Sequence, residues 1–256
     1  MEINLIYSLI AGISIGGVSA YLGSLMLQRR MSLAAGPLGH LAFPGVALAL
    51  LYGFDMSLGA FPFVVLGIVL IWLFENKTKL PTEALTAVVF ASGVALSFLF
   101  LPIDKAEEAL VGSISNINLT EMLATMFISM GVLLLIRYIY REMTIMSVSE
   151  DLASVEGINT KKYNFFFLLS ISIMVALGVK LVGALLTAAL VSIPAATAKN
   201  ISGSMKSYIM FSVLAGILSS IIGIFIYKTT YLPAGILIIL TSASFFLVSL
   251  FFVKKK

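Results

Sequence analysis

The stretch RRMSLAAGPLGHLAFPG, Arg29–Gly45, lies between two long apolar runs and contains His40, the only histidine of the chain. Its paired arginines are typical of a cytoplasmic membrane boundary, because basic residues resist translocation and are attracted to anionic lipid headgroups. Gly36, Pro37 and Pro44 predict that the following helix is interrupted at membrane depth. Such a break is tolerated only where protein or a water-filled cavity satisfies the freed backbone groups, so this stretch is the first candidate for a permeation pathway.

The composition predicts a protein that crosses the membrane several times. Of 256 residues, 60% are hydrophobic and only 11% are charged, which is more apolar surface than a soluble fold could bury. The absence of cysteine excludes disulfides and thiolate metal ligands, and a single histidine excludes a polyhistidine metal centre within one chain. The first apolar run follows Glu2 without a basic region, so we interpret it as a retained span and not as a cleaved signal peptide.

Nine apolar runs are close to the length of about 20 residues that a helix needs to cross a hydrocarbon core of about 30 Å. The runs are Asn4–Gln28, Leu33–Tyr52, Ser57–Phe74, Glu83–Leu101, Leu119–Tyr140, Tyr163–Val179, Val182–Ala198, Met205–Tyr227 and Pro233–Val253. The second and seventh contain prolines and could be broken or re-entrant, so the sequence predicts an all-α polytopic bundle of eight to nine transmembrane helices. No repeat or linker divides the chain, which favours a single transmembrane domain over residues 1–256.

The basic residues indicate how this bundle is oriented. With alternating spans and the paired arginines in the cytoplasm, thirteen of the sixteen Lys and Arg residues face inward, and only Lys105, Lys180 and Lys228 face outward. This bias predicts a multi-pass protein of the plasma membrane with its N-terminus outside and its C-terminus in the cytoplasm. The sequence pI of about 9.2 follows from this topology, so membrane lipid and not nucleic acid is the expected contact of the basic face.

The predicted cytoplasmic loop at residues 141–164 is the longest polar stretch of the chain. Within it Ser149 is suited to cap a helix, two acidic residues follow in the first turn, and Gly157 is suited to end it. Leu152 and Val155 give the short helix a modest apolar stripe. A docking element for a partner is one interpretation, and a solvated turn between two spans is the other.

His40 is the residue best placed to carry chemistry, because an ionisable group within a span is by default a functional hypothesis. An equally open alternative is structural: its imidazole could bond a backbone carbonyl freed by Gly36 or Pro37. The sequence has no Walker GxxxxGK[ST], protease or dinucleotide-binding motif, so we expect no catalytic residues, no enzyme activity and no bound cofactor. The absence of acidic residues deep in the spans also argues against proton-coupled transport.

Four stretches are similar to those of a known family, the ABC-3 integral-membrane permeases of ATP-binding cassette importers for zinc, manganese or iron. Arg29–Gly45 resembles the family segment RRMSLLGDALSHAxLPG, and Ser147–Asn164 resembles the loop ending in GLNxxxLN that docks on the ATPase. Val182–Ala198, VGALLTAALVSIPAATA, resembles VGxLLVxALLVIPAATA and is the most specific of the matches. YLPAG at Tyr231–Gly235 is similar to DLPSG.

The resemblance implies a type II importer permease that pairs with a second permease copy. It also implies a separate ATPase subunit on the cytoplasmic side, which hydrolyses the ATP, and an extracellular substrate-binding protein. His40 matches the family histidine that meets the metal, which makes a divalent metal the implied cargo. The residues implied in coupling to the ATPase are Glu150, Asp151, Val155 and Gly157. The structural residues of the matched motifs are Pro44, Gly183 and Pro194.

The chain departs from the family pattern at three positions. Gly36 stands where the family has an aspartate, four residues before His40, and Gly39 stands where it has a serine. Tyr231 replaces the aspartate of DLPSG. Loss of two acids removes the hard oxygen ligands that a bare metal ion prefers. Three functions therefore stay open: import of Zn, Mn or Fe, import of a metal chelate or small organic solute by the same architecture, and a non-transporting scaffold or regulatory subunit.

Overall fold

The computed structural model describes residues 2–29, 39, 41–78, 80, 82–100, 117–230 and 232–253. Within these ranges the chain forms helices and no strand, which confirms the predicted all-α class. The helices are α1 (Glu2–Gln28), α3 (Phe43–Tyr52), α4 (Met56–Lys77), α5 (Thr82–Phe100), α7 (Leu119–Val148), α8 (Glu150–Val155), α9 (Thr160–Ile201), α10 (Met205–Thr230), α11 (Ala234–Ser249) and the short 3₁₀ helix η1 (Leu250–Phe252).

Every one of the nine predicted apolar runs overlaps a helix or half of a helix. Six helical segments, in α1, α4, α7, α9, α10 and α11, are long and apolar enough to cross a membrane, and the apolar parts of α3 and α5 are shorter. The sixth and seventh runs are the two halves of α9, which is interrupted by non-helical backbone at Gly183. The chain is therefore a polytopic membrane bundle.

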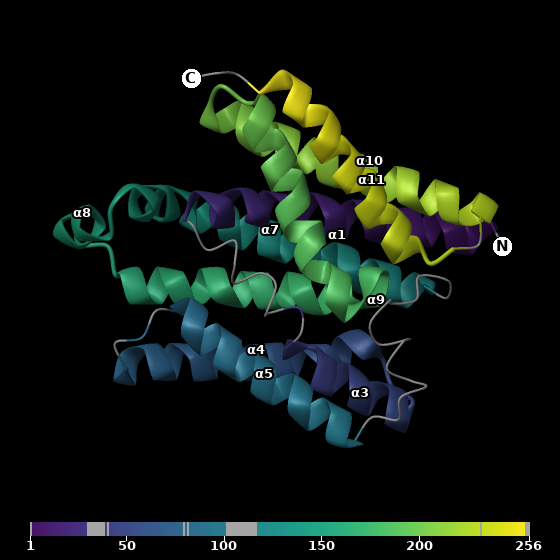
Figure 1. The fold of residues 1–256 in the computed structure, drawn as a ribbon, viewed down its shortest axis with the longest axis horizontal. Coiled ribbons are helices and arrows are strands. Elements are labelled where there is room, and N and C mark those ends of the chain that lie inside the picture. The colour runs from purple at the N-terminus through teal and green to yellow at the C-terminus, as the bar shows by residue number, and fades with distance from the viewer. Residues whose placement is uncertain are drawn as a thin grey trace.

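The chain reverses direction at Gly183, within α9. Figure 1 shows the first half of α9 running from the end near α8 toward the opposite end, and the second half crossing back. The backbone at Gly183 has φ 82° and ψ 163°, a conformation that is essentially restricted to glycine because a Cβ would clash. The interruption of the seventh run is thus at Gly183 and not at Pro194, where the helix continues.

Pro44 lies where the second predicted run, Leu33–Tyr52, is broken, because α3 begins only at Phe43. Pro44 occupies the first turn of α3, where the missing N–H has no intrahelical partner to lose. Gly36 and Pro37, the other residues expected to interrupt this span, lie outside the described residues.

The core is built around α1, which packs against α7, α9 and α10. Small residues on α1 and α10, such as Gly12 and Gly216, permit close approach of the two helices. A Cβ added at Gly216 would lie 2.7 Å from the Cβ of Ala20, and one at Gly12 would lie 3.6 Å from the Cβ of Ser220. In a bilayer, such contacts replace the hydrophobic drive that brings helices together in water.

Different segments of the chain lie at the two ends of the bundle. In Figure 1, α8 and the end of α11 lie at one end, and the start of α1 lies at the other. At the α8 end the Arg29 guanidinium donates to the side-chain oxygen of Asn164, which joins the end of α1 to the beginning of α9. Gln28 donates to the sulfur of Met205 over 2.7 Å at the same end. These contacts connect segments that enter and leave the bundle there.

Candidate permeation segment and docking helix

The second half of α9 is enclosed by glycines from several parts of the chain. A Cβ at Gly39 would lie 2.8 Å from the carbonyl oxygen of Ala184, and one at Gly235 would lie 2.7 Å from the Cα of Val182. A Cβ at Gly178, in the first half of α9, would lie 3.0 Å from the γ-methyl of Thr187. Since no larger side chain fits these positions without movement, the segment after Gly183 is held in one place by close backbone contact.

Thr187 stabilises the start of this segment from within. Its hydroxyl donates to the carbonyl oxygen of Gly183 over 2.6 Å, and its side chain is fully buried. This bond satisfies a backbone carbonyl next to the break, which matters because an unpaired polar group in a bilayer is costly. Pro194 is buried further along the same segment.

His40 lies outside the described residues, but its neighbours on both sides are described. Gly39 packs on Ala184, one residue beyond the break in α9, and its carbonyl accepts from the N–H of Ala42 over 3.3 Å. Leu41 is buried in the core. Gly39, the residue before His40, therefore lies beside the start of the second half of α9. The predicted pathway role of His40 stays a prediction.

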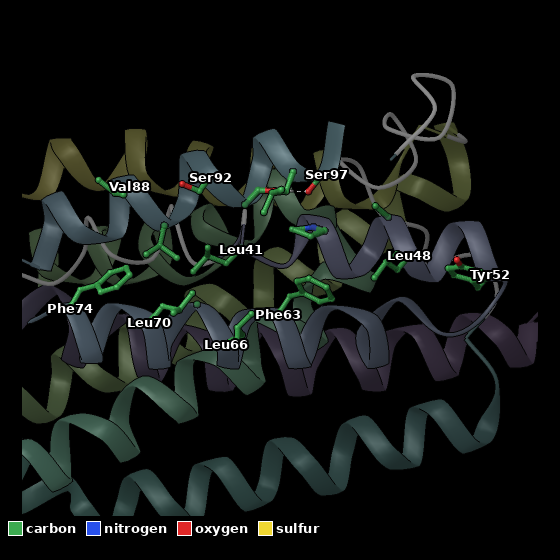
Figure 2. A pocket seen from close by; sticks show the side chains of 16 residues that line it. Leu41, Leu48, Tyr52, Phe63, Leu66, Leu70, Phe74, Val88, Ser92 and Ser97 are labelled. Atoms are coloured by element: carbon green, nitrogen blue, oxygen red, sulfur yellow. Dashed lines mark hydrogen bonds between the residues drawn. The ribbon is translucent and has the colours of Figure 1, made fainter. Parts of the chain in front are cut away.

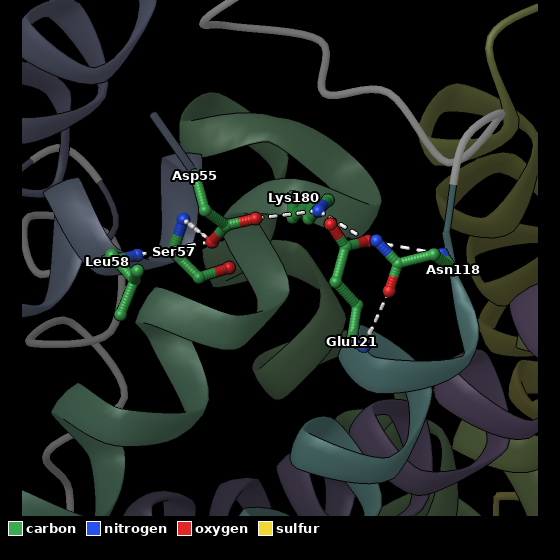
Figure 3. Close-up of polar contacts among 6 residues, drawn as sticks. All are labelled: Asp55, Ser57, Leu58, Asn118, Glu121 and Lys180. Carbon is green, nitrogen blue, oxygen red and sulfur yellow. Dashed lines mark hydrogen bonds and ion pairs between the residues drawn. The ribbon is translucent and has the colours of Figure 1, made fainter. Parts of the chain in front are cut away.

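A charged cluster joins three segments at the end of the bundle opposite α8 (Figure 3). Lys180, three residues before the break in α9, lies 2.7 Å from the Asp55 carboxylate and 2.7 Å from the Glu121 carboxylate. Asp55 caps α4 by accepting from the N–H groups of Ser57 and Leu58. The three side chains are 21–31% exposed, so water screens them only partly.

The two carboxylates of this cluster are held by different local structures. Burial by itself would raise the pKa of Asp55, but the hydrogen bond and charge of Lys180, with the two backbone N–H donors, hold the pKa below its ordinary value. The Asp55 carboxylate is therefore charged at neutral pH. Glu121 belongs to a capping box at the start of α7, in which its backbone N–H donates to Asn118 over 2.9 Å.

We expect Lys180→Met to destabilise the folded protein by about 1–3 kcal/mol, between the values typical of exposed and of buried ion pairs. The substitution leaves two carboxylates without their shared cation, so they repel each other and lose a charged hydrogen bond. Thermal unfolding of the purified protein in detergent measures the effect. Lys228→Met is the matched control, because Lys228 is exposed at the end of α10 and pairs with no carboxylate among the described residues. Equal melting temperatures for the two variants would contradict this prediction.

A cavity of about 620 Å³ lies between α3, α4 and α5 (Figure 2). Its walls are largely aliphatic and aromatic, with Phe63 and Phe74 from α4 and Pro44 from α3. Among the described residues that line it none is charged, and the hydroxyl of Ser97 already donates to the carbonyl of Gly93 over 2.8 Å. The described part of the lining can therefore hold apolar groups and contains no charged ligand for a bare metal ion. Within the described ranges, no three His, Cys, Asp or Glu residues come together as a metal site.

Helix α8 has the start and the end predicted from the sequence. The Ser149 hydroxyl accepts from the N–H of Leu152 over 3.2 Å, which confirms the cap. Gly157 has φ 77°, and the N–H of Ile158 donates to the carbonyl of Ala153 over 2.9 Å, as in a Schellman ending. These features fix a helix of six residues between α7 and α9.

The outer surface of α8 combines exposed apolar side chains with an exposed acidic one. Val155 is 86% exposed and Leu152 is 48% exposed, whereas Ala153 is buried against the bundle. Asp151 is exposed beside them, and Glu150 is the first residue of the helix. Exposed apolar side chains on a rigid, capped helix are typical of a surface that docks on another protein. The predicted roles of Glu150, Asp151, Val155 and Gly157 in coupling stay predictions.

The charged cluster was not foreseen from the sequence. The distribution of basic residues predicts only that Lys180 faces outward, and Glu121 stands near the start of the predicted run Leu119–Tyr140. The sequence did contain one local indication, since Asn118 followed three residues later by Glu121 is the pattern of a capping box before an apolar run. It gave no indication that residues 125 positions apart, Asp55 and Lys180, would meet.

The chain was compared with protein families, curated proteins and solved structures. It is 30% identical to the manganese import system permease protein ScaB of Streptococcus parasanguinis, with 97% of this chain and 90% of that protein covered. It is 28% identical to the high-affinity zinc uptake system membrane protein ZnuB of Haemophilus influenzae, with 95% of each covered. The structure of PsaBC from Streptococcus pneumoniae in complex with Fab matches with a TM-score of 0.82 and 30% identity, covering 94% of this chain and 89% of that one. The ABC 3 transport family matches residues 2–253, and the chain therefore belongs to this family.

Proposed function

We propose that this protein is the membrane permease subunit of an ATP-binding cassette importer for a divalent transition metal. The observation that carries the proposal is the family match over residues 2–253. The names of the relatives, which include manganese and zinc transport proteins, support a metal as cargo. ATP hydrolysis belongs to a separate subunit, since the chain has no nucleotide-binding motif of its own.

Each proposed partner is assigned to one end of the bundle or to the membrane between them. The ATPase docks on α8, whose exposed Leu152 and Val155 form an apolar surface. The α8 end is cytoplasmic, because most basic residues were assigned to that side, and the N-terminus is outside. An extracellular binding protein delivers the cargo to the opposite end, where the charged cluster lies. A second copy of the chain completes the pathway in the plasma membrane.

His40 is the residue proposed to meet the cargo. The proposal is supported by the residue before His40, Gly39, which packs on Ala184 at the start of the second half of α9. Arg29–Gly45 contains a histidine and no carboxylate, which suits zinc or iron better than manganese, because manganese prefers oxygen ligands. Gly36 and Tyr231 stand where relatives of this family carry acids, so between manganese and zinc the ligand chemistry favours zinc.

ATP-driven uptake into proteoliposomes tests this function. The chain is reconstituted with its ATPase and its binding protein, and uptake of zinc, manganese and iron is measured with metal-sensitive dyes. We expect zinc uptake that depends on ATP and exceeds manganese uptake, and we expect His40→Gln to reduce it to the level without ATP. ATP hydrolysis without uptake of any of the three metals would overturn the proposal, and uptake of manganese alone would overturn the preference for zinc.

Helix packing must be shown to survive the change at His40. Binding of the ATPase to the His40→Gln protein and its thermal unfolding serve as the controls, and both should equal those of the unmodified chain. Full uptake by the variant would contradict a role of His40 in the pathway. It would favour the structural alternative, in which the imidazole bonds a backbone carbonyl.

A further inference from the structure

A second cavity, of about 670 Å³, lies between α1, α7 and α10 at the α8 end of the bundle. One part of its wall is polar and carries Tyr21, Arg137, Tyr140 and Lys206. The other part is apolar and carries Leu133, Ile209, Met210 and Val213. None of the described residues that line it is acidic, so the cavity combines positive charge with an apolar face.

The two basic side chains lack acidic partners. Arg137 and Lys206 are both exposed, and neither forms an ion pair with a carboxylate in the part of the chain that the structure describes. They come from different helices, α7 and the first turn of α10, and converge on one cavity. Two unpaired cations facing the same space repel each other, and an anion placed between them would relieve the repulsion.

The cavity lies at the depth of lipid headgroups. Arg137 is about 27 Å along α7 from its first residue at 1.5 Å per residue, close to the thickness of a hydrocarbon core of about 30 Å. Lys206 starts α10 at this same end. Tyr21 and Tyr140 add the amphipathic rings that are frequent at membrane interfaces. The basic part of the wall is thus level with phosphate groups.

The apolar part of the wall leads toward lipid tails. Met210 is 52% exposed and Leu214, one turn further along α10, is 45% exposed. On α7, Leu134 is 59% exposed next to Leu133. An acyl chain can follow this strip into the hydrocarbon core, whereas a free anion would gain nothing from it.

We propose that this cavity binds an anionic phospholipid of the inner leaflet. The phosphate is held between Arg137 and Lys206, and an acyl chain packs along Ile209, Met210 and Val213. The bound lipid would link α1, α7 and α10 in the half of α7 that leads to α8. The inference requires only the membrane location of the bundle and does not depend on the identity of the cargo.

Native mass spectrometry of the delipidated full-length protein tests the proposal. Palmitoyl-oleoyl phosphatidylglycerol is added in one series, and phosphatidylcholine with the same acyl chains in the other. We expect tighter binding of phosphatidylglycerol, with about a fivefold loss for each basic residue removed and about a 25-fold loss for Arg137→Gln with Lys206→Gln together. Equal binding of the two lipids, or undiminished binding by the double variant, would overturn the proposal.

Three controls test whether the bound anion is a lipid or free phosphate, and whether the losses of binding are specific to the two basic residues. Arg137→Lys with Lys206→Arg keeps both charges and should keep the preference for phosphatidylglycerol. Lys228→Gln removes a basic residue from the opposite end of α10 and should leave binding unchanged. Inorganic phosphate in large excess should not displace the lipid. Displacement by phosphate would show a site for a free anion and would overturn the assignment to lipid.

Discussion

Gly183→Ala is expected to destabilise the protein and to abolish transport. A backbone with φ 82° and ψ 163° is accessible in practice only to glycine, and forcing another residue into it costs about 1–3 kcal/mol. The alternative for the variant is to straighten α9, which would pull the segment after the break away from the glycines that enclose it. Thermal unfolding in detergent and ATP-driven uptake in proteoliposomes measure the two consequences.

Gly131→Ala is the matched control for this experiment. Gly131 lies within regular α7, and a Cβ there would have no atom within 4 Å. Alanine at a regular helical position is favoured over glycine by about 1 kcal/mol, so this variant should be as stable as the unmodified chain or more stable. If Gly183→Ala behaved like Gly131→Ala in both assays, the break in α9 would have no role in the fold or in transport.

The features that the sequence predicted correctly are those that depend on neighbouring residues. The apolar runs marked the helices, because the length and hydrophobicity of a span are properties of a continuous segment. Ser149 and Gly157 marked the limits of α8, since caps and left-handed endings are chosen within a few residues.

The features that the sequence did not predict arise from contacts across the fold. The seventh run was predicted to be either continuous or broken because it contains a proline. It is broken, but at Gly183, and Pro194 is accommodated in the helix. The meeting of Asp55, Glu121 and Lys180, like the cavity shared by Arg137 and Lys206, requires the packing of helices far apart in the sequence. Neither the composition nor the spacing of residues along the chain indicates which of these side chains lie close together in the fold.

Val155→Glu is expected to disconnect the permease from its ATPase while leaving the bundle intact. Val155 is 86% exposed at the tip of α8, so the new carboxylate meets water in the free permease and costs the fold little. In the proposed complex the same side chain is buried at the centre of the contact, where an unpaired charge is strongly unfavourable. The loss typical of a central interface residue, about 2 kcal/mol or more, corresponds to roughly 30-fold weaker binding.

Binding of the purified ATPase to the permease measures this loss, and ATP-driven uptake should fall in parallel. Val253→Glu is the control, because Val253 is an exposed valine beyond α11 that lies outside the proposed docking surface. Unchanged thermal unfolding of Val155→Glu, combined with weak ATPase binding, would separate docking from folding. If the ATPase bound Val155→Glu as tightly as the unmodified chain, α8 would be a solvated turn between two spans, and the surface that receives the ATPase would have to lie elsewhere on this end of the bundle.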